Sequence, residues 1–160
     1  MAAEPSSPAP RWLDDDEHEA WRSTAMLLIR LPAQLDAEMT RRCGLTFFEY
    51  SLLAVLSESP ERTRQMSEIA AATSSSLSRL SHVATRLEGR GLIRRTRVEG
   101  PGRRTNATLT EEGMALVVAV APTHVEIVRE LVLDRLTPTQ LTTFGRLAGR
   151  IAAGDDCPPR

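Results

Sequence analysis

The sequence predicts a mostly α-helical fold with one small β-hairpin, an α+β arrangement. Helical patterns cover most of the chain, and two of them, residues 65–73 and 77–88, are separated by a serine-rich turn at 74–76. Two strand-like runs follow, residues 92–98 and 104–109, joined by a turn that contains Gly-Pro-Gly. Helix, turn, helix and basic hairpin is the layout of a winged helix-turn-helix. The apolar helices on both sides of this unit are expected to mediate dimerisation.

The N-terminal part begins with a stretch rich in Pro, Ser and Ala, residues 1–13, which we expect to be a disordered tail. Four consecutive acids follow at 14–17. Acids at a helix N-terminus interact favourably with the helix dipole, which explains them without a metal. A helix is then predicted over about 21–42, and Pro32 should kink or split it. We assign residues 14–42 to a dimerisation helix region.

The next unit, residues 43–109, is the predicted winged helix-turn-helix domain. Thr46-Phe47-Phe48-Glu49 is a capping box, because the side chains of Thr46 and Glu49 can each satisfy a free backbone N–H of the other. A helix should therefore begin here and run to about Ser57, and Ser59-Pro60 should end that unit. Two glycines end the second helix of the later pair.

The C-terminal part, residues 110–153, is predicted to form two more dimerisation helices. Thr110 and the acids after it should open a long apolar helix that reaches about Leu136. Thr137-Pro138-Thr139-Gln140 is a second capping box with Pro at the first helical position, and it predicts a last helix. Residues 154–160 are expected to be a frayed tail.

Positive charge is concentrated in the second helix of the pair and in the hairpin. The whole chain has a formal net charge of −1, yet eight arginines lie between Arg79 and Arg104, against two acids, Glu88 and Glu99. A local excess of this kind is a sign of a nucleic-acid footprint. The alternative is that the arginines only solvate a helix face and a hairpin. The shared sign on both elements favours double-stranded DNA as the partner.

The helix at 77–88 has two distinct faces when about 100° is allowed per residue. Its buried stripe is predicted to contain Leu77, Leu80, Ala84 and Leu87, with Val83 just beyond. The outward face carries hydroxyls, a His and arginines, which can enter a major groove and bond base edges or only phosphates. With the turn and the hairpin included, the expected DNA contacts are Ser75, Ser76, Ser78, Arg79, Ser81, His82, Thr85, Arg86, Arg95, Arg97, Arg103 and Arg104.

The flanking helices are more apolar than a small winged core needs. Residues 114–121 and 125–136 are apolar on more than one face. Such a surplus calls for a partner surface, and a symmetric dimer is the commonest solution. A dimer also suits DNA reading, because two recognition helices can address two half-sites about one turn apart. The alternative is that these helices pack only on their own chain.

Enzymatic chemistry is not expected. His18, His82 and His124 lie in separate helices, and the sequence has neither a Gly-rich nucleophile elbow nor a phosphate-binding loop. We expect no metal and no cofactor. The sequence has no apolar run of about 18 residues that could span a membrane, and its N-terminus lacks a signal-peptide pattern, so we expect a cytoplasmic protein.

Two cysteines, Cys43 and Cys157, do not form a disulfide framework. Cys43 is expected to end a helix just before Gly44. The neighbouring Arg41 and Arg42 would lower the pKa of its thiol. A cysteine-based redox-sensing regulator is therefore one alternative function, beside the simpler interpretation that both cysteines are incidental. A winged protein–protein interaction module without operator binding is another alternative.

Several short motifs occur in a consistent order over roughly residues 20–153: Gly44-Leu45-Thr46, Ser67-Glu68-Ile69-Ala70, Leu87-Glu88-Gly89-Arg90-Gly91-Leu92-Ile93, Arg95, and Leu109-Thr110-Glu111-Glu112-Gly113. In this order the chain resembles the MarR (multiple antibiotic resistance regulator) family of bacterial transcription factors. Each motif alone is a weak signal, and their joint order is the specific one.

The resemblance implies a transcriptional repressor that acts as a homodimer on a palindromic operator. It also implies release by a small aromatic or phenolic ligand bound between the dimerisation helices and the winged core. The sequence departs from the family at the wing tip, where Pro101-Gly102-Arg103 stands in place of Asp-x-Arg, and at Ser74, where Gly is common. Candidate pocket residues, which ordinary core packing would also explain, are Trp21, Arg30, Phe47, Phe48 and Tyr50.

Overall fold

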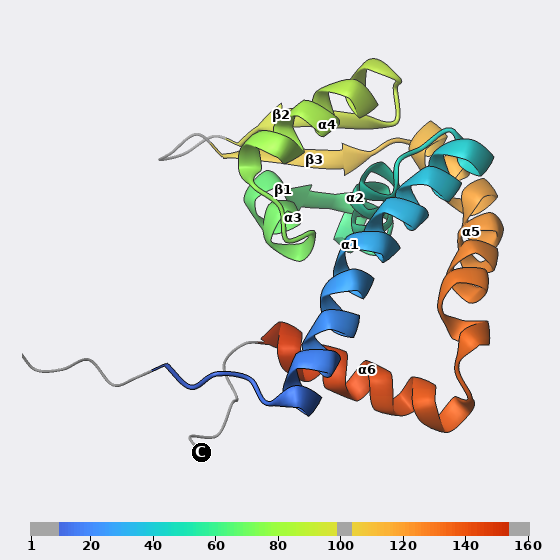
Figure 1. Cartoon of the computed structure of the whole chain (residues 1–160). Coiled ribbons are helices and arrows are strands. Elements are labelled where there is room, and N and C mark those ends of the chain that lie inside the picture. Colours follow the sequence, from blue (N-terminus) through green and yellow to red (C-terminus); the bar gives the residue numbers. More distant parts are fainter. Residues whose placement is uncertain (1–9, 99–103, 154–160) are drawn as a thin grey trace, which may run out of the picture.

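The computed structural model describes residues 10–98 and 104–153 (Figure 1). Within these residues the fold is mostly helical, with a small antiparallel sheet, as the sequence predicts. The helices are α1 (Asp15–Cys43), α2 (Phe47–Ser57), α3 (Met66–Ala72), α4 (Leu77–Gly89), α5 (Glu111–Leu131) and α6 (Pro138–Ala153). The strands are β1 (Thr63–Gln65), β2 (Ile93–Arg97) and β3 (Thr105–Leu109), and two short 3-10 helices span Pro60–Arg62 and Leu133–Arg135.

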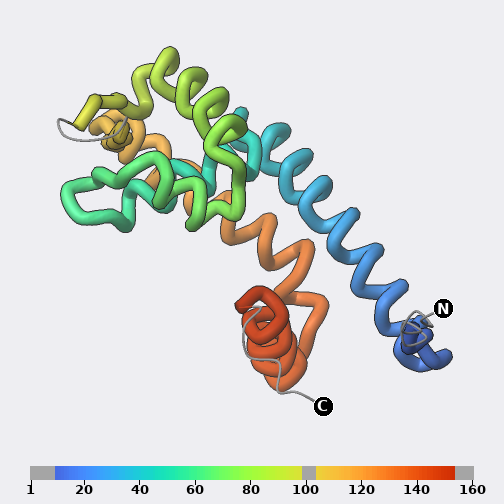
Figure 2. The backbone as a smooth tube through the Cα atoms, turned by 90° about the vertical axis from the view of Figure 1, so that its left-hand side faces the viewer, coloured from blue at the N-terminus to red at the C-terminus, as the bar shows by residue number. Residues whose placement is uncertain are grey.

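The elements form a winged part from which helical arms extend. Helices α2, α3 and α4 and the sheet pack together, and Met39 of α1 and Ile127 of α5 are buried in the same core. Beyond this shared core, α1 and α5 diverge from the winged part as two arms (Figure 2). The chain continues from the end of α5 into α6. The core of the winged part is apolar and fully enclosed. Its completely buried side chains include Leu52, Leu53, Leu56, Ile69, Leu80 and Leu87.

The sheet has three strands in the order β1-β3-β2, all antiparallel, so the predicted hairpin gains one strand. Thr63 of β1 faces Thr108 of β3, and their hydroxyl oxygens lie 2.8 Å apart. A strand of three residues is too short to show the alternating pattern from which strands are predicted. Its pairing with β3 is therefore visible only in three dimensions.

Local capping explains where most helices begin. Asp14, Thr46 and Thr137 each take part in a capping box, at the starts of α1, α2 and α6 respectively. The sequence prediction was wrong at the start of α1, which begins at Asp15 because Asp14 and Glu17 cap it. Splitting at Pro32 was also wrong, since α1 continues through this residue as one helix.

Three further expectations need correction. Helix α5 ends at Leu131 instead of about Leu136, and a 3-10 turn follows it. Leu77 is 53% exposed and so lies outside the buried stripe of α4, because it is the first residue of the helix and projects beyond the core. Ser74 occupies the turn with φ of +48°, the left-handed conformation that usually favours glycine. None of the helices in the described residues is long and apolar enough to cross a membrane.

Candidate DNA interface

The turn between α3 and α4 is built by its own serines. Ser76 is the N-cap of α4, and its hydroxyl accepts a hydrogen bond from the backbone N–H of Arg79 at 3.2 Å. Ser75 is half-buried, and its N–H donates to the carbonyl oxygen of Ala70 at 2.9 Å. Two of the serines that were expected to meet DNA therefore also fix the angle between α3 and α4. Such capping orders the N-terminal turn of α4, which the helix-turn-helix geometry directs toward DNA.

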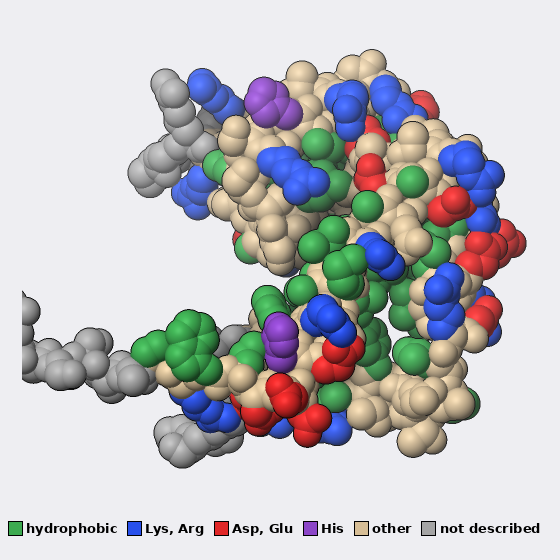
Figure 3. All heavy atoms as spheres, in the orientation of Figure 1, with side chains coloured by type: hydrophobic (Ala, Val, Ile, Leu, Met, Phe, Trp, Pro, Cys, Tyr) green, Lys and Arg blue, Asp and Glu red, His purple; other side chains and the backbone are tan. Residues whose placement is uncertain are grey.

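The outward face of α4 has the composition that the sequence predicts. All six expected residues of this helix are exposed: Ser78, Arg79, Ser81, His82, Thr85 and Arg86. The hydroxyl of Thr85 donates to the backbone carbonyl of Ser81 at 2.9 Å, so this side chain lies along its own helix. Figure 3 shows basic side chains over the winged part of the molecule, around the position of α4. The arrangement presents short polar groups flanked by longer cations.

Two arginines of α4 contact the first turn of α2. The Cζ atom of Arg79 lies 4.5 Å from the centre of the Phe48 ring. The Nε of Arg86 donates to Oε1 of Glu49 at 2.9 Å, and Nη1 of Arg90 lies 3.9 Å from the same oxygen. Glu49 is buried. Sequence reasoning identified Glu49 only as a capping residue, because nothing in the local pattern reveals a partner 37 residues away.

The wing is attached to α4 through Arg95. Its guanidinium donates twice to Oε2 of Glu88, from Nε at 2.9 Å and from Nη2 at 2.7 Å. Its backbone N–H donates to the other carboxylate oxygen at 2.7 Å. These hydrogen bonds hold the pKa of Glu88 below its ordinary value. Arg95 was expected to bind DNA, and the structure engages it in this internal pair, with a side chain only 24% exposed.

The other cations of the wing are placed differently. Arg97 of β2 and Arg104, just before β3, are both exposed, as a contact with DNA requires. The predicted wing-tip contact Arg103 and the unusual Pro101-Gly102 pair lie outside the described residues. Among the expected wing contacts, Arg97 and Arg104 are therefore the ones whose exposure supports the prediction.

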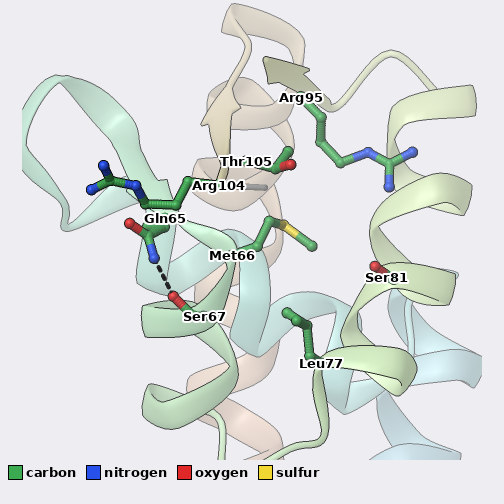
Figure 4. A pocket seen from close by; sticks show the side chains of 8 residues that line it. All are labelled: Gln65, Met66, Ser67, Leu77, Ser81, Arg95, Arg104 and Thr105. Atoms are coloured by element: carbon green, nitrogen blue, oxygen red, sulfur yellow. Dashed lines mark hydrogen bonds between the residues drawn. The ribbon is translucent and has the colours of Figure 1, made fainter. Parts of the chain in front are cut away.

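A hollow of about 280 Å³ separates the wing from α3 and α4 (Figure 4). Met66 and Leu77 supply apolar surface to it, and Ser81 lines it from α4. Arg95 and Arg104 line it from the wing side. Met66 and the exposed Leu77 thus form the apolar wall of a space whose other lining groups are hydroxyls, guanidinium groups and the amide of Gln65.

The five candidate pocket residues are not brought together within one chain. Trp21 precedes the end of α1 by 22 residues, which corresponds to about 33 Å along a helix. Arg30 lies on the same helix and is exposed. Phe48 faces α4, as described above. Only Phe47 and Tyr50 share a neighbour, which is His124 of α5.

His124 packs between two aromatic rings. Its ring centre lies 6.0 Å from that of Phe47 and 4.5 Å from that of Tyr50. Its Nδ1 atom is buried and has no hydrogen-bond partner among the described residues. Burial lowers the pKa of His124, because the charged imidazolium would lose its solvation. The α2–α5 contact is therefore aromatic and holds His124 neutral near pH 7.

Cys43 does not have the environment of a reactive thiol. The pKa of Cys43 is raised, because burial disfavours the thiolate more than Arg42 stabilises it. Arg42 is itself engaged, since its guanidinium donates to both carboxylate oxygens of Glu130, at 3.0 and 2.6 Å. The expected lowering of the Cys43 pKa is therefore wrong. No group of three or more His, Cys, Asp or Glu side chains within residues 10–98 and 104–153 is arranged to hold a metal.

An exposed polar helix behind a serine-capped turn, with an arginine-bearing wing beside it, defines a winged helix-turn-helix protein. The sequence model of the MarR family matches residues 44–104. A solved structure of Sco3205, a MarR family transcriptional regulator from Streptomyces coelicolor in complex with DNA, has a TM-score of 0.86 to this chain. The two are 38% identical, and the alignment covers 94% of each.

Two other relatives agree with this assignment. AbsC, a MarR family transcriptional regulator from Streptomyces coelicolor, is 40% identical with a TM-score of 0.81, and the match covers 91% of this chain and 97% of AbsC. The HTH-type transcriptional regulator PecS of Dickeya dadantii is 39% identical over 66 residues, which make up 41% of this chain and 39% of PecS. The chain therefore belongs to the MarR family of transcriptional regulators.

Proposed function

We propose that this regulator binds double-stranded DNA with α4 in the major groove and the wing against the neighbouring backbone. The composition of α4 carries the proposal. From Ser78 to Arg86 every exposed side chain of this helix is a hydroxyl, an imidazole or a guanidinium, and none is acidic. Groups of these kinds bond base edges and phosphates. The similarity to Sco3205, whose structure was solved in complex with DNA, supports the same function here.

We further propose that the active form is a homodimer. None of the 16 residues of α6 is buried, although the helix carries Phe144, Leu147 and Ile151. The first half of α1 exposes Trp21, Leu28 and Ile29 in the same way. Figure 3 shows further apolar side chains at the lower left, on the stretch that leads into α1. A second copy of the chain would cover both surfaces and place two α4 helices on one DNA duplex.

The dimer is proposed to act as a repressor on a palindromic operator, in the cytoplasm. A small aromatic or phenolic acid is the proposed effector, since Phe47 and Tyr50 line the α2–α5 contact where the arms join the winged part. Trp21 lies too far along α1 to reach that contact in the same chain, because about 22 Å of helix separates it from Asp36, whose carboxylate accepts a hydrogen bond from the N–H of Phe47. Trp21 belongs to such a pocket only if the partner chain of the dimer supplies it.

The test is a binding assay with DNA from upstream of the regulator's own gene and with a scrambled duplex, across a range of salt concentrations. We expect tight binding to one upstream site, with an affinity that falls as salt rises because phosphate contacts release counterions. Footprinting should show two protected half-sites about 10 base pairs apart, centre to centre. Binding that ignores both sequence and salt would contradict the proposal and support a protein–protein interaction module.

A further inference from the structure

We propose that Phe48 and Glu49, at the start of α2, are positioning residues that orient Arg79 and Arg86 of α4 for sequence-specific contacts with DNA. The inference rests on the proposed function, in which α4 enters the major groove. It assigns a role in DNA reading to two residues that lie outside the helix-turn-helix and outside the wing.

The two arginines lie on one stripe of α4. They are seven residues apart, which is close to two helical turns, so they point within about 20° of the same direction. Phe48 and Glu49 are consecutive residues at the start of α2; Phe48 contacts Arg79, and Glu49 binds Arg86, with Arg90 at the longer distance of 3.9 Å. The ring of Phe48 lies 4.5 Å from the Cζ of Arg79, and Oε1 of Glu49 lies 2.9 Å from the Nε of Arg86.

Glu49 is itself held in place by α2. Its Oε2 accepts a hydrogen bond from the backbone N–H of Thr46 at 2.7 Å, and its own N–H donates to the Thr46 hydroxyl at 3.1 Å. The residue is 3% exposed. One carboxylate oxygen thus closes the capping box, and the other binds the guanidinium of Arg86. Because the carboxylate cannot move without opening the start of α2, it fixes the direction of Arg86.

Both arginines keep donors for a further partner. A guanidinium has five N–H donors in one plane, and the hydrogen bond from Arg86 to Glu49 uses one of them. The side chain of Arg86 remains 57% exposed. Arg79 is held through the face of an aromatic ring, a contact that leaves the N–H groups at the edge of its guanidinium free to bond. Each side chain is thus held at one point and available at another.

The charge of Glu49 gives the proposal a distinctive consequence. A carboxylate near the DNA surface weakens attraction to any phosphate backbone, while fixing Arg86 strengthens contact with one particular sequence. Glu49→Gln keeps the shape of the side chain and can still accept the Thr46 hydrogen bond, but it loses the charge that binds Arg86. Affinity for the operator should therefore fall while affinity for random DNA rises slightly.

The experiment measures dissociation constants of the full-length chain for the footprinted operator and for a scrambled duplex at fixed salt. For Glu49→Gln we expect the operator-to-scrambled preference to fall about tenfold. Glu58→Gln is the matched control, because it removes one charge from the exposed end of α2, away from α4. Its preference for the operator over the scrambled duplex should equal that of the wild type. Circular dichroism and thermal unfolding confirm that each variant is folded. An unchanged preference in a folded Glu49→Gln protein overturns the role of Glu49.

The role of Phe48 has its own pair of variants. Phe48→Leu removes the aromatic face and should lower the operator-to-scrambled preference severalfold. Phe48→Tyr keeps the aromatic face and should retain that preference. In an Arg79→Ala background, Phe48→Leu should cause no further loss, since the two residues act through one contact. Additive losses, or equal losses for Leu and Tyr, overturn the role of Phe48. A wild-type protein without operator preference would instead overturn the proposed function itself.

Discussion

Arg95 of β2 binds Glu88 of α4 through three hydrogen bonds, one from its backbone and two from its guanidinium. Both carboxylate oxygens take part, at distances between 2.7 and 2.9 Å. The pair joins the last part of α4 to the first strand of the wing. The two elements proposed to touch DNA are therefore fixed to each other before DNA is present, which reduces the ordering that binding would otherwise require.

Replacing Glu88 with Gln should loosen this attachment. A hydrogen bond to a charged group contributes about 1.5–3 kcal/mol, and partial exposure to solvent reduces this, so we expect unfolding to become easier by about 1 kcal/mol. Urea denaturation measures the change. Glu126→Gln removes an exposed carboxylate from α5 and is the control. Equal effects of the two substitutions would show that the pair does not stabilise the fold.

The same pair makes stability depend on pH. In the folded protein, Arg95 lowers the pKa of Glu88 from its ordinary value of 4.5. The stabilisation is therefore fully present above pH 4.5 and is lost as the pH falls through the lower, folded-state pKa. Between pH 7 and pH 3, the free energy of unfolding measured by urea denaturation should fall less for Glu88→Gln than for the wild type. If it falls equally in both proteins, the Glu88–Arg95 pair is not the source of the pH dependence.

Gly113 in the first turn of α5 should not tolerate alanine. A Cβ atom at this position would lie 2.1 Å from the backbone oxygen of Leu92 and 2.6 Å from Cδ1 of Leu109. Since the closest atom belongs to the backbone, α5 would have to shift away from the sheet, and we expect a loss of about 2–4 kcal/mol.

The control for that substitution lies in α6. A Cβ at Gly145 meets nothing within 4 Å, and alanine is favoured over glycine in a helix by up to about 1 kcal/mol. Gly145→Ala should therefore leave the thermal midpoint unchanged or raise it. A small effect at Gly113, comparable to that at Gly145, would contradict the close approach of α5 to the sheet.

Arg79 and His82 are the longest side chains on the N-terminal half of the outward face of α4. Substitution of either by Ala should cost about 1–3 kcal/mol in binding to the operator. The cost on scrambled DNA should be much smaller, because phosphate contacts elsewhere are retained. Titrations of each variant with both duplexes provide the measurement. Equal losses on both duplexes would mean that the residue only contacts phosphate.

The exposed apolar face of α6 predicts a dimer that depends on it. Ile151 is 75% exposed in the single chain, so an aspartate there would be harmless to a monomer. In a dimer that buries this face, Ile151→Asp should convert a species of about twice 17.6 kDa into one of 17.6 kDa at low micromolar concentration. Light scattering measures the mass. Thr142 lies on the opposite face of α6, about 180° around the helix axis from Ile151. A Thr142→Asp protein should therefore keep the mass of a dimer.

Features that depend on neighbours in sequence were predictable. The capping boxes at Thr46 and Thr137 set the starts of α2 and α6, and both are formed as predicted. The buried stripe of α4 was also predicted, except for Leu77, because helical periodicity does not tell where the covering elements end. The MarR family assignment followed from the order of several such local motifs and is confirmed by the relatives.

Features that depend on distant partners were not predictable. The sequence shows Arg86 and Arg95 only as cations beside a basic hairpin, and nothing in it links them to Glu49 and Glu88. Those links depend on the packing of α4 against α2 and of β2 against α4. The same reason explains the missed strand β1. The DNA contacts themselves stay predictions. The structure divides the predicted arginines into those that bind a carboxylate of the same chain, such as Arg95, and those that are simply exposed, such as Arg97.

Every cation on α4 and on the strands of the wing is an arginine, and the sequence contains no lysine. A guanidinium stays protonated to above about pH 12, so the positive charge that these arginines give to the surface is constant wherever the protein is folded. Acetylation of side-chain amines has no target here, and methylation of arginine retains the charge. We therefore expect this regulator to release DNA by a change in conformation or assembly rather than by a loss of arginine charge.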